Sequence, residues 1–256
     1  MNGKGGRIMV WQEYESVEKS ALWFLGQSGF YLKSGGVSVV IDPYLSDCVG
    51  ENSPLFTRIY PAPVSPYDLK ADIYIVTHDH LDHLDPSTIR AYSHKEETIF
   101  VAPRHAAKKL EILGINPQQI RIVDQGDGLA VSGVNIQGVF ALGTDEGVLD
   151  TTGYRIRFEN GKSVYHTSDT SFCDLLLRAC PHADVLLPCI NGKFGNLTAE
   201  QAVLLTQAVN PQYVVPHHYD VMELNGENPN VFRYFCAQSE MEEKCRILKP
   251  LEMLEW

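Results

Sequence analysis

The chain has 256 residues, of which 44% are hydrophobic and 21% are charged, and its formal net charge is −11 at pH 7. This length fits one large domain or two small ones, with enough apolar material for a substantial core. No apolar run reaches the roughly 18 residues that a membrane span needs, so we expect no membrane partner. The acidic balance repels polyanions, and the densest basic segment, HAAKKLEILG, is typical of the solvated face of a helix, so we expect no nucleic acid either.

The N-terminal segment MNGKGGRIMVWQEYESVEK lacks the apolar central stretch of a signal peptide. The six cysteines include no C-x-x-C pair and form no compact framework. Together these observations favour free thiols over disulfides. We therefore expect a cytoplasmic protein.

In chain order, short runs rich in Val, Ile, Tyr and Phe predict β-strands at residues 21–27, 29–34, 37–42, 72–77, 98–102, 120–123, 134–141, 153–158, 162–167, 184–188, 212–216 and 246–250. Capping signals or apolar periodicity predict helices after Asp85-Pro86, over 103–113, after the capping box Thr198–Gln201, and over 228–243. Residues 50–70 contain four prolines and predict a long surface excursion that covers a site. This pattern indicates sheets in the middle and helices outside.

Residues 77–85, THDHLDHLD, are the densest cluster of polar chemistry in the chain. Three of the nine histidines fall within six positions, directly after the apolar run ADIYIV. Side chains at i and i+2 of an extended segment point to the same side, so His78 and His80 can converge on one point. Asp82 and His83 follow where the chain turns toward the next helix, which aims them at a second point nearby. Imidazole and carboxylate together suit zinc, manganese or iron, so the spacing predicts a metal site.

Two further strand ends carry candidate ligands. The segment SVYHTSDTS ends a strand before Asp169, and QYVVPHHYD ends another before His217 and His218. A carboxylate that bridges two cations is a standard feature of two-metal hydrolytic sites, in which the ions lie roughly 3.5–4 Å apart and activate a water. Beside the cluster and the second histidine pair, Asp169 is a candidate for this bridging position.

These motifs resemble those of a known family. THDHLDHLD, HTSD and PHHYD, preceded by LGQSGFYLKSGGVSVVIDPYLSD, are similar in kind and order to the metallo-β-lactamase superfamily of metal-dependent hydrolases over residues 21–219. The opening motif and PHHYDV most resemble the branch that contains L-ascorbate-6-phosphate lactonase. The resemblance implies one domain over residues 1–256 with an α/β (α+β) fold, a four-layer αββα sandwich of two mixed sheets flanked by helices. It also implies that the metal site lies along one edge of the sandwich.

Carried over residue by residue, the resemblance implies ligands for a first metal, ligands for a second metal and a bridging carboxylate. The family places its last ligand directly before the aromatic residue of PHHYD, which selects His218 over His217. One or two divalent ions are expected, zinc or manganese, with iron as an alternative. The implied ligands are His78 and His80 for the first ion, Asp82 and His83 for the second, Asp169 between them, and His218 as a further ligand.

Four other residues are expected to support the site without binding the metal. Asp42, in VVIDPYL, matches an early aspartate that supports the site, and partners of this kind fix ring orientation and ligand basicity. His166 and His217 are expected beside the ligands. Many relatives carry another ligand histidine where FALGTDEG has Gly143, which offers no side-chain donor. Asp145 is then either a substitute or a support, and the first ion is either lost or exchangeable.

The resemblance implies a hydrolase in which a metal-bound hydroxide attacks a carbonyl or phosphoryl centre. Asp82 is expected to orient that water or accept its proton. The branch suggests a lactone or ester of a small molecule, such as a phosphorylated sugar acid, and a homo-oligomer. Lys193 and Asn196 are the candidate contacts for its anionic group. The alternatives are a phosphodiesterase or ribonuclease of the same superfamily, and a non-catalytic metal-binding protein, which Gly143 suggests.

Overall fold

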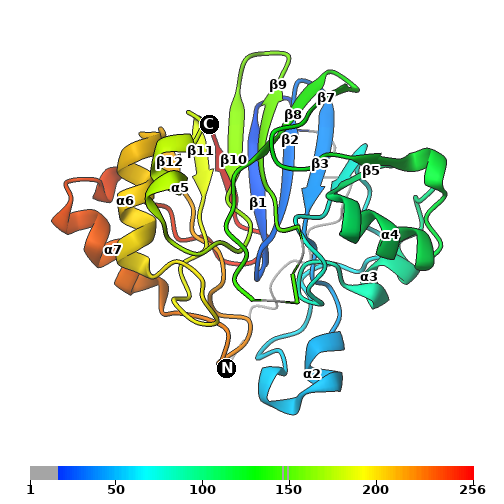
Figure 1. Ribbon diagram of the computed structural model, residues 1–256, viewed down its shortest axis with the longest axis horizontal. Coiled ribbons are helices and arrows are strands. Elements are labelled where there is room, and N and C mark those ends of the chain that lie inside the picture. The colour runs from blue at the N-terminus through cyan, green and yellow to red at the C-terminus, as the bar shows by residue number, and fades with distance from the viewer. Residues whose placement is uncertain (1–16, 146, 149) are drawn as a thin grey trace, which may run out of the picture.

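The computed structural model describes residues 17–145, 147–148 and 150–256. Two β-sheets face each other, and helices cover their outer sides (Figure 1). The N-terminal segment, residues 1–19, lies mostly outside the described residues. Within them, no helix is long and apolar enough to cross a membrane. The strands are Ala21–Gly26 (β1), Gly29–Ser34 (β2), Val37–Ile41 (β3), Ile73–Ile75 (β4), Ile99–Ala102 (β5), Ile120–Ile122 (β6), Gly128–Val131 (β7), Val134–Val139 (β8), Gly153–Phe158 (β9), Ser163–His166 (β10), Val185–Leu187 (β11), Tyr213–Val214 (β12) and Met253–Glu255 (β13).

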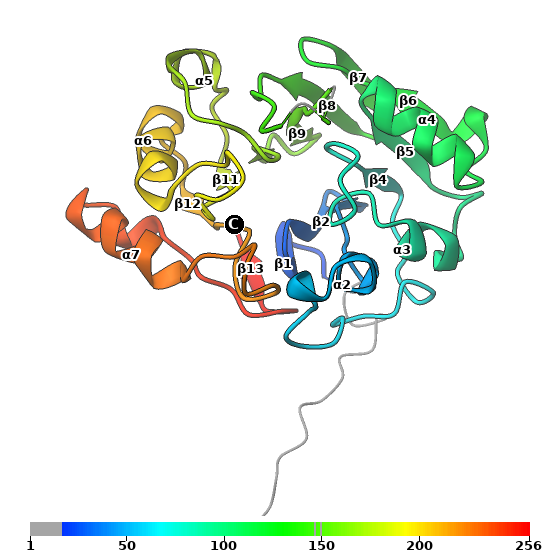
Figure 2. The same cartoon turned by 60° about the horizontal axis from the view of Figure 1, so that its bottom comes forward.

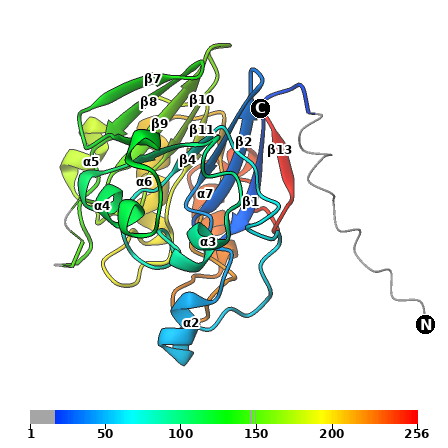
Figure 3. The same ribbon diagram turned by 90° about the vertical axis from the view of Figure 1, so that its right-hand side faces the viewer.

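Both sheets are mixed. The first has the order β13-β1-β2-β3-β4-β5-β6, in which β1, β2 and β3 pair antiparallel and β3 to β6 pair parallel. The second has the order β12-β11-β10-β9-β8-β7, with antiparallel pairs from β7 to β10 and parallel pairs from β10 to β12. Figure 3 shows the two sheets from the side. The parallel part of each sheet brings several strand ends to one edge of the sandwich.

Alternation along β1 explains the layers. Successive side chains of a strand point to opposite faces. Leu22 and Phe24 therefore join the large apolar cluster between the sheets, whereas Trp23 and Leu25 join a second cluster beneath the outer helices. All four side chains are buried, so β1 has no solvent face.

The helices flank both sheets. Figure 2 shows α3 and α4 beside the first sheet and α5, α6 and α7 beside the second. Asp85 caps α3 by accepting hydrogen bonds from Ser87 N–H and Thr88 N–H, and Thr198 and Gln201 form the predicted capping box of α6. The helices are Cys48–Asn52 (α2), Pro86–Ala91 (α3), Arg104–Ile112 (α4), Asp174–Ala179 (α5), Ala199–Val209 (α6) and Pro229–Gln238 (α7), with short 3₁₀ turns at Pro54–Phe56 (η1), Pro117–Gln119 (η2) and Glu242–Lys244 (η3).

The predicted fold class is confirmed, because two mixed sheets lie between flanking helices. One predicted strand, residues 246–250, is wrong. Arg246 N–H still donates to Val214 O at 2.9 Å, but Leu248 then pairs with a side chain instead of a strand. Its N–H donates to the Tyr219 hydroxyl at 3.1 Å, and its carbonyl accepts from that hydroxyl at 2.5 Å. Strands β7 and β13 and helices α2 and α5 are all short and were not predicted.

Candidate metal centre

The predicted ligands follow strands that end at one edge of the sandwich. Asp42 comes directly after β3, and residues 77–83 follow β4, which runs parallel to β3. In the second sheet, Asp169 follows β10 and His218 follows β12, and these strands are joined in parallel through β11. The carboxyl ends of parallel strands meet at the same edge, so segments far apart in sequence come together beside α2, at the bottom of Figure 1.

His78 and His80 form the first group of nitrogen donors. Nδ1 of His78 lies 3.0 Å from Thr77 Oγ1 and 3.3 Å from Ser168 Oγ, which leaves Nε2 to face Nδ1 of His80 at 3.0 Å. Nε2 of His80 lies 3.0 Å from Asp145 Oδ2. Burial lowers the pKa of His78 well below its usual value, so the ring stays neutral, which is the form that binds metals. One nitrogen of each ring therefore remains available to an ion.

Asp82, His83, Asp169 and His218 form the second group. Nε2 of His83 lies 3.3 Å from Nε2 of His218, and both face Oδ1 of Asp169, at 3.4 Å and 2.8 Å respectively. Oδ2 of Asp82 lies 3.9 Å from the His83 nitrogen and 4.0 Å from the His218 nitrogen. Asp82, His83 and His218 thus each offer a donor atom within 4.8 Å of the other two, and Asp169 Oδ1 lies beside both imidazole nitrogens.

The second group fits a divalent metal ion. Two donors that each lie about 2.0–2.1 Å from a tetrahedral zinc are roughly 3.3 Å apart. The nitrogens of His83 and His218 have this separation. Nδ1 of His83 lies 2.7 Å from Asp42 Oδ2, so this ring presents Nε2 to the ion. Donor type, spacing and ring orientation all suit a metal.

Buried charge supports the same conclusion. Burial alone would lower the pKa of His83, yet the carboxylates of Asp169, Asp82 and Asp42 outweigh it and raise this pKa well above its usual value. Against the same effect of burial, Asp169 also raises the pKa of His218. In return the two imidazoles hold the pKa of Asp169 well below its usual range, although burial opposes them. The excess of carboxylate charge is one that a cation neutralises in place of protons.

Two amide side chains that sequence reasoning missed hold this group in place. Nε2 of Gln27 donates to Asp82 Oδ2 at 2.8 Å and lies 3.0 Å from His218 Nδ1. Nδ2 of Asn225 donates to the same Asp82 oxygen at 3.2 Å. Gln27 is fully buried and has a positive φ of 54°. It belongs to LGQSGF, within the motif that carries the resemblance, but no local pattern connects it with residues so distant in sequence.

Among the predicted supporting residues, Asp42 contacts one of the predicted metal ligands, His83, directly. Asn196, expected at the substrate, donates from Nδ2 to Asp169 Oδ2 at 2.9 Å and is buried. Lys193 is exposed, and its Nζ donates to Gly226 O at 2.8 Å. Both residues therefore have contacts within the protein, and a contact of either with the substrate stays a prediction.

His166 and His217 form a buried, stacked pair with ring centroids 4.5 Å apart. Nδ1 of His217 lies 2.9 Å from Ser28 Oγ, and Nε2 of His166 donates to Ser28 O at 3.0 Å. Ser168 N–H donates to the other nitrogen of His166 at 3.1 Å. The pair packs against residues adjacent in sequence to Gln27 and to Asp169, and His217 also offers a donor atom within 4.8 Å of donors of Asp169 and His218. Burial lowers the pKa of His166 to about 4.

Asp145 contacts His80 on the nitrogen that faces away from His78. It therefore contacts a predicted ligand, and its role as a substitute for the missing histidine or as a support stays a prediction. A Cβ added at Gly143 would lie 3.5 Å from Val148 O, an ordinary contact. Packing therefore does not require glycine at this position.

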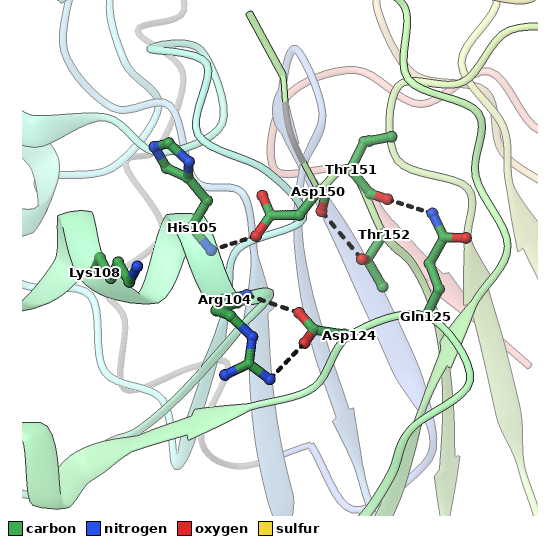
Figure 4. Close-up of a pocket in the computed structure, with 8 residues that line it drawn as sticks. All are labelled: Arg104, His105, Lys108, Asp124, Gln125, Asp150, Thr151 and Thr152. Carbon is green, nitrogen blue, oxygen red and sulfur yellow. Dashed lines mark hydrogen bonds and ion pairs between the residues drawn. The ribbon is translucent and has the colours of Figure 1, made fainter.

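A cavity of about 470 Å³ lies beside the centre (Figure 4). It meets the centre through two threonines, since Thr152 N–H donates to Thr77 O at 3.0 Å and Thr151 Oγ1 donates to Asp169 O at 3.0 Å. No predicted ligand lines it, and its Arg104 pairs with Asp124 at 3.1 Å. The lining residues are Arg104, His105, Lys108, Asp124, Gln125, Asp150, Thr151 and Thr152.

Comparison with known proteins places this geometry in a family. The family described as "Beta-lactamase superfamily domain" matches residues 21–218. A UPF0173 metal-dependent hydrolase of Archaeoglobus fulgidus is 29% identical over 244 residues, which cover 91% of this chain and 97% of the relative. One of Hyperthermus butylicus is 26% identical over 236 residues, which cover 91% and 98%.

Solved structures agree in fold. Igni18, a metallo hydrolase of Ignicoccus hospitalis, has a TM-score of 0.74 at 23% identity and covers 93% of this chain and 98% of its own. The metallo-beta-lactamase fold protein YhfI of Bacillus subtilis has a TM-score of 0.67 at 16% identity, with coverages of 94% and 100%. The superfamily part of the resemblance is confirmed, while the lactonase branch stays a prediction. The chain belongs to the metallo-β-lactamase superfamily.

Proposed function

We propose that the protein hydrolyses an ester or lactone of a small molecule with the help of a divalent ion, zinc or manganese. The observation that carries this proposal is the convergence of buried donor groups: Asp82, His83 and His218 lie within 4.8 Å of one another, and Asp169 Oδ1 lies beside both imidazole nitrogens. The names of the curated relatives, metal-dependent hydrolases, support it. A cytoplasmic location and assembly into a homo-oligomer belong to the same proposal.

A divalent cation bound there supplies a Lewis acid and lowers the pKa of a water to about 7. The chain's own residues orient the reacting groups. Gln27 and Asn225 fix Oδ2 of Asp82, whose side chain is 11% exposed, so Asp82 can accept a proton from a water at the open side. Asn196 fixes one oxygen of Asp169 and leaves the other facing the imidazoles.

One observation favours a second candidate function. Gly143 adds no donor beside the nitrogens of His78 and His80, so an ion there would have to share His83 or Asp169 with the second group, and a site with few protein donors of its own holds its ion weakly. Non-catalytic metal binding by the second group would then be the function. Turnover separates the two candidates.

The first experiment is elemental analysis of protein purified without chelator or tag-derived metal. It is combined with turnover of aryl esters, lactones and an aryl phosphodiester. We expect bound metal that falls at least tenfold in His218→Ala and is unchanged in His94→Ala. His94 is a suitable control because it is partly exposed and pairs with Glu97 outside this group.

Absence of metal after reloading would contradict the proposal. Stoichiometric metal without turnover of any of these substrates would support the non-catalytic candidate. A preference for the phosphodiester would make the protein a phosphodiesterase of the same superfamily.

A further inference from the structure

Exposed apolar side chains lie on the loops that carry the candidate metal centre, and we call them the apolar rim. They belong to Leu81, Leu142, Phe194 and Leu224, which are 39%, 40%, 58% and 43% exposed. Apolar surface in water costs about 25 cal/mol per Å², and exposed apolar groups that gather around one point mark binding sites. These side chains stay exposed to solvent in the folded chain, so a ligand is the partner that would cover them.

Two members of the rim, Leu81 and Leu142, belong to segments that contact the predicted metal ligands or their neighbours. Leu81 lies within the metal motif itself, and its carbonyl accepts a hydrogen bond from Cys48 Sγ of α2 at 3.5 Å. Leu142 N–H donates to Thr170 Oγ1 at 2.9 Å, and Thr170 directly follows Asp169. Both leucines are therefore neighbours of predicted ligands.

The other two members lie beside the amides that hold the carboxylates. Phe194 precedes Asn196 by two residues, and Leu224 directly precedes Asn225. The ring of Phe194 lies 5.9 Å from that of Phe56 in η1, which is half-buried. The segment 50–70, which the sequence predicts to cover a site, thus adds an aromatic ring to the rim.

The charge of the surrounding loops disfavours an anionic ligand. These loops contain eight Asp or Glu and two Lys or Arg. Nζ of Lys193 donates to Gly226 O at 2.8 Å, and Nη1 of Arg58 donates to Tyr44 O at 2.7 Å. A surface of this sign repels a phosphate or carboxylate. The loops are residues 47–58, 79–84, 142–145, 170–173, 190–198 and 219–228.

Two buried amide oxygens also disfavour an anionic ligand. Gln27 and Asn196 donate from nitrogen to Asp82 and Asp169, so their oxygens also lie close to the centre. Oε1 of Gln27 and Oδ1 of Asn196 have no hydrogen-bond partner within the described part of the chain. A buried acceptor repels an anionic oxygen and accepts a hydrogen bond from a hydroxyl or an N–H group.

We propose that the substrate is an uncharged ester or lactone with an alkyl or aryl chain, and that the apolar rim binds this chain. The inference rests on the proposed hydrolase function and names its substrate class. A phosphorylated sugar acid, which the lactonase branch suggests, would meet an acidic surface whose two cationic side chains, Lys193 and Arg58, donate hydrogen bonds to backbone carbonyls.

The test is binding of alkyl hydroxamates, which chelate metal ions, to the zinc-loaded protein by calorimetry. The series runs from acetohydroxamate to octanohydroxamate, and suberic acid monohydroxamate is the anionic probe of similar length. We expect Kd to tighten about threefold for each methylene that the rim covers. We expect the anionic probe to bind at least tenfold more weakly than octanohydroxamate.

Phe194→Ala should flatten this dependence on chain length. Tyr234→Ala is the matched control, because Tyr234 is also an aromatic residue with 58% exposure but lies on α7, and it should keep the dependence. Equal affinity along the series, tighter binding of the anionic probe, or no binding by any hydroxamate would each overturn the inference. Failure of the hydrolase proposal is a different result, since it would show as absent turnover while the zinc-loaded protein keeps the dependence of hydroxamate affinity on chain length.

Discussion

Oδ2 of Asp42 lies 2.7 Å from Nδ1 of His83, and the same carboxylate accepts hydrogen bonds from the backbone N–H of Thr77 at 2.8 Å and from its hydroxyl at 2.6 Å. The end of β3 thereby fixes the imidazole at the middle of the second donor group. Partners of this kind set both the orientation and the basicity of a metal-binding ring.

Asp42→Asn keeps the shape of the side chain and removes its charge. We expect metal affinity to fall by about 10- to 100-fold, because the His83 ring loses its charged hydrogen-bond acceptor. Competition with a chromogenic chelator measures this change. Asp72→Asn is the control, since Asp72 accepts hydrogen bonds from Ser38 near the other end of the same strand. Equal losses in the two variants would refute the specific role of Asp42.

Gln27 allows a test of the amide that joins Asp82 and His218. In Gln27→Ala both contacts are lost, whereas Gln27→Glu also places a carboxylate against Asp82. Like charges at this distance repel, so we expect the glutamate variant to bind metal more weakly than the alanine variant. The metal content of the two variants after dialysis shows which of them binds metal more weakly. The reverse order would mean that Gln27 acts through packing alone.

Gly143→His supplies the donor that this position lacks. The position accepts a Cβ without a close contact, so the variant should fold. We expect a gain of up to one bound ion per chain relative to the wild type, measured by elemental analysis. Gly143→Ala fills the same space without a nitrogen and should leave the metal content unchanged. An equal gain in both variants would show that the added donor is not the cause.

From the lowered pKa of His166 we expect the free energy of unfolding of the metal-free protein to fall at acidic pH. Its pKa in the folded state is about 4, because of burial, whereas an unfolded histidine has a pKa of about 6.5. Between these values the unfolded chain binds the proton, so the free energy of unfolding falls as the pH drops through this window. From pH 7 to pH 5 this one group should remove about 2 kcal/mol.

Urea unfolding of the metal-free wild type and of His166→Gln at both pH values measures this contribution. The variant should lose about 2 kcal/mol less than the wild type over the interval. It is expected to be less stable at pH 7, since His166 accepts a hydrogen bond from Ser168 N–H and donates one to Ser28 O. His94→Gln is the control and should keep the wild-type dependence. Identical pH dependence in all three proteins would contradict the prediction.

Local patterns in the sequence indicated central sheets, outer helices and the region of the site, whereas the αββα sandwich was implied by the resemblance to the superfamily. Buried parallel strands are short apolar runs, and polar residues directly after them mark the edge where such strands end. The spacing of residues 77–83 and the histidines of PHHYD therefore indicated one edge before any contact was known. Capping at Asp85 and Thr198 is likewise local, and both predictions are confirmed.

What the sequence did not reveal depends on contacts between distant residues. Gln27 reaches Asp82 and His218 across separations of 55 and 191 residues, which no local pattern encodes. Residues 246–250 have the composition of a strand, but Tyr219 takes the hydrogen bonds of Leu248 that a strand would use. Lys193 is available as a cation in the sequence, whereas in the fold its ammonium group contacts a backbone carbonyl.

The Nε2 atoms of His83 and His218 lie 3.3 Å apart, although 135 residues separate the two histidines along the chain. An ion shared by both is therefore a topological cross-link that closes a loop of that length and fastens one sheet to the other. The conformational entropy that such a link removes from the unfolded chain grows with the logarithm of loop length. Loss of the ion would thus loosen the whole sandwich at this edge as well as remove the reactive centre.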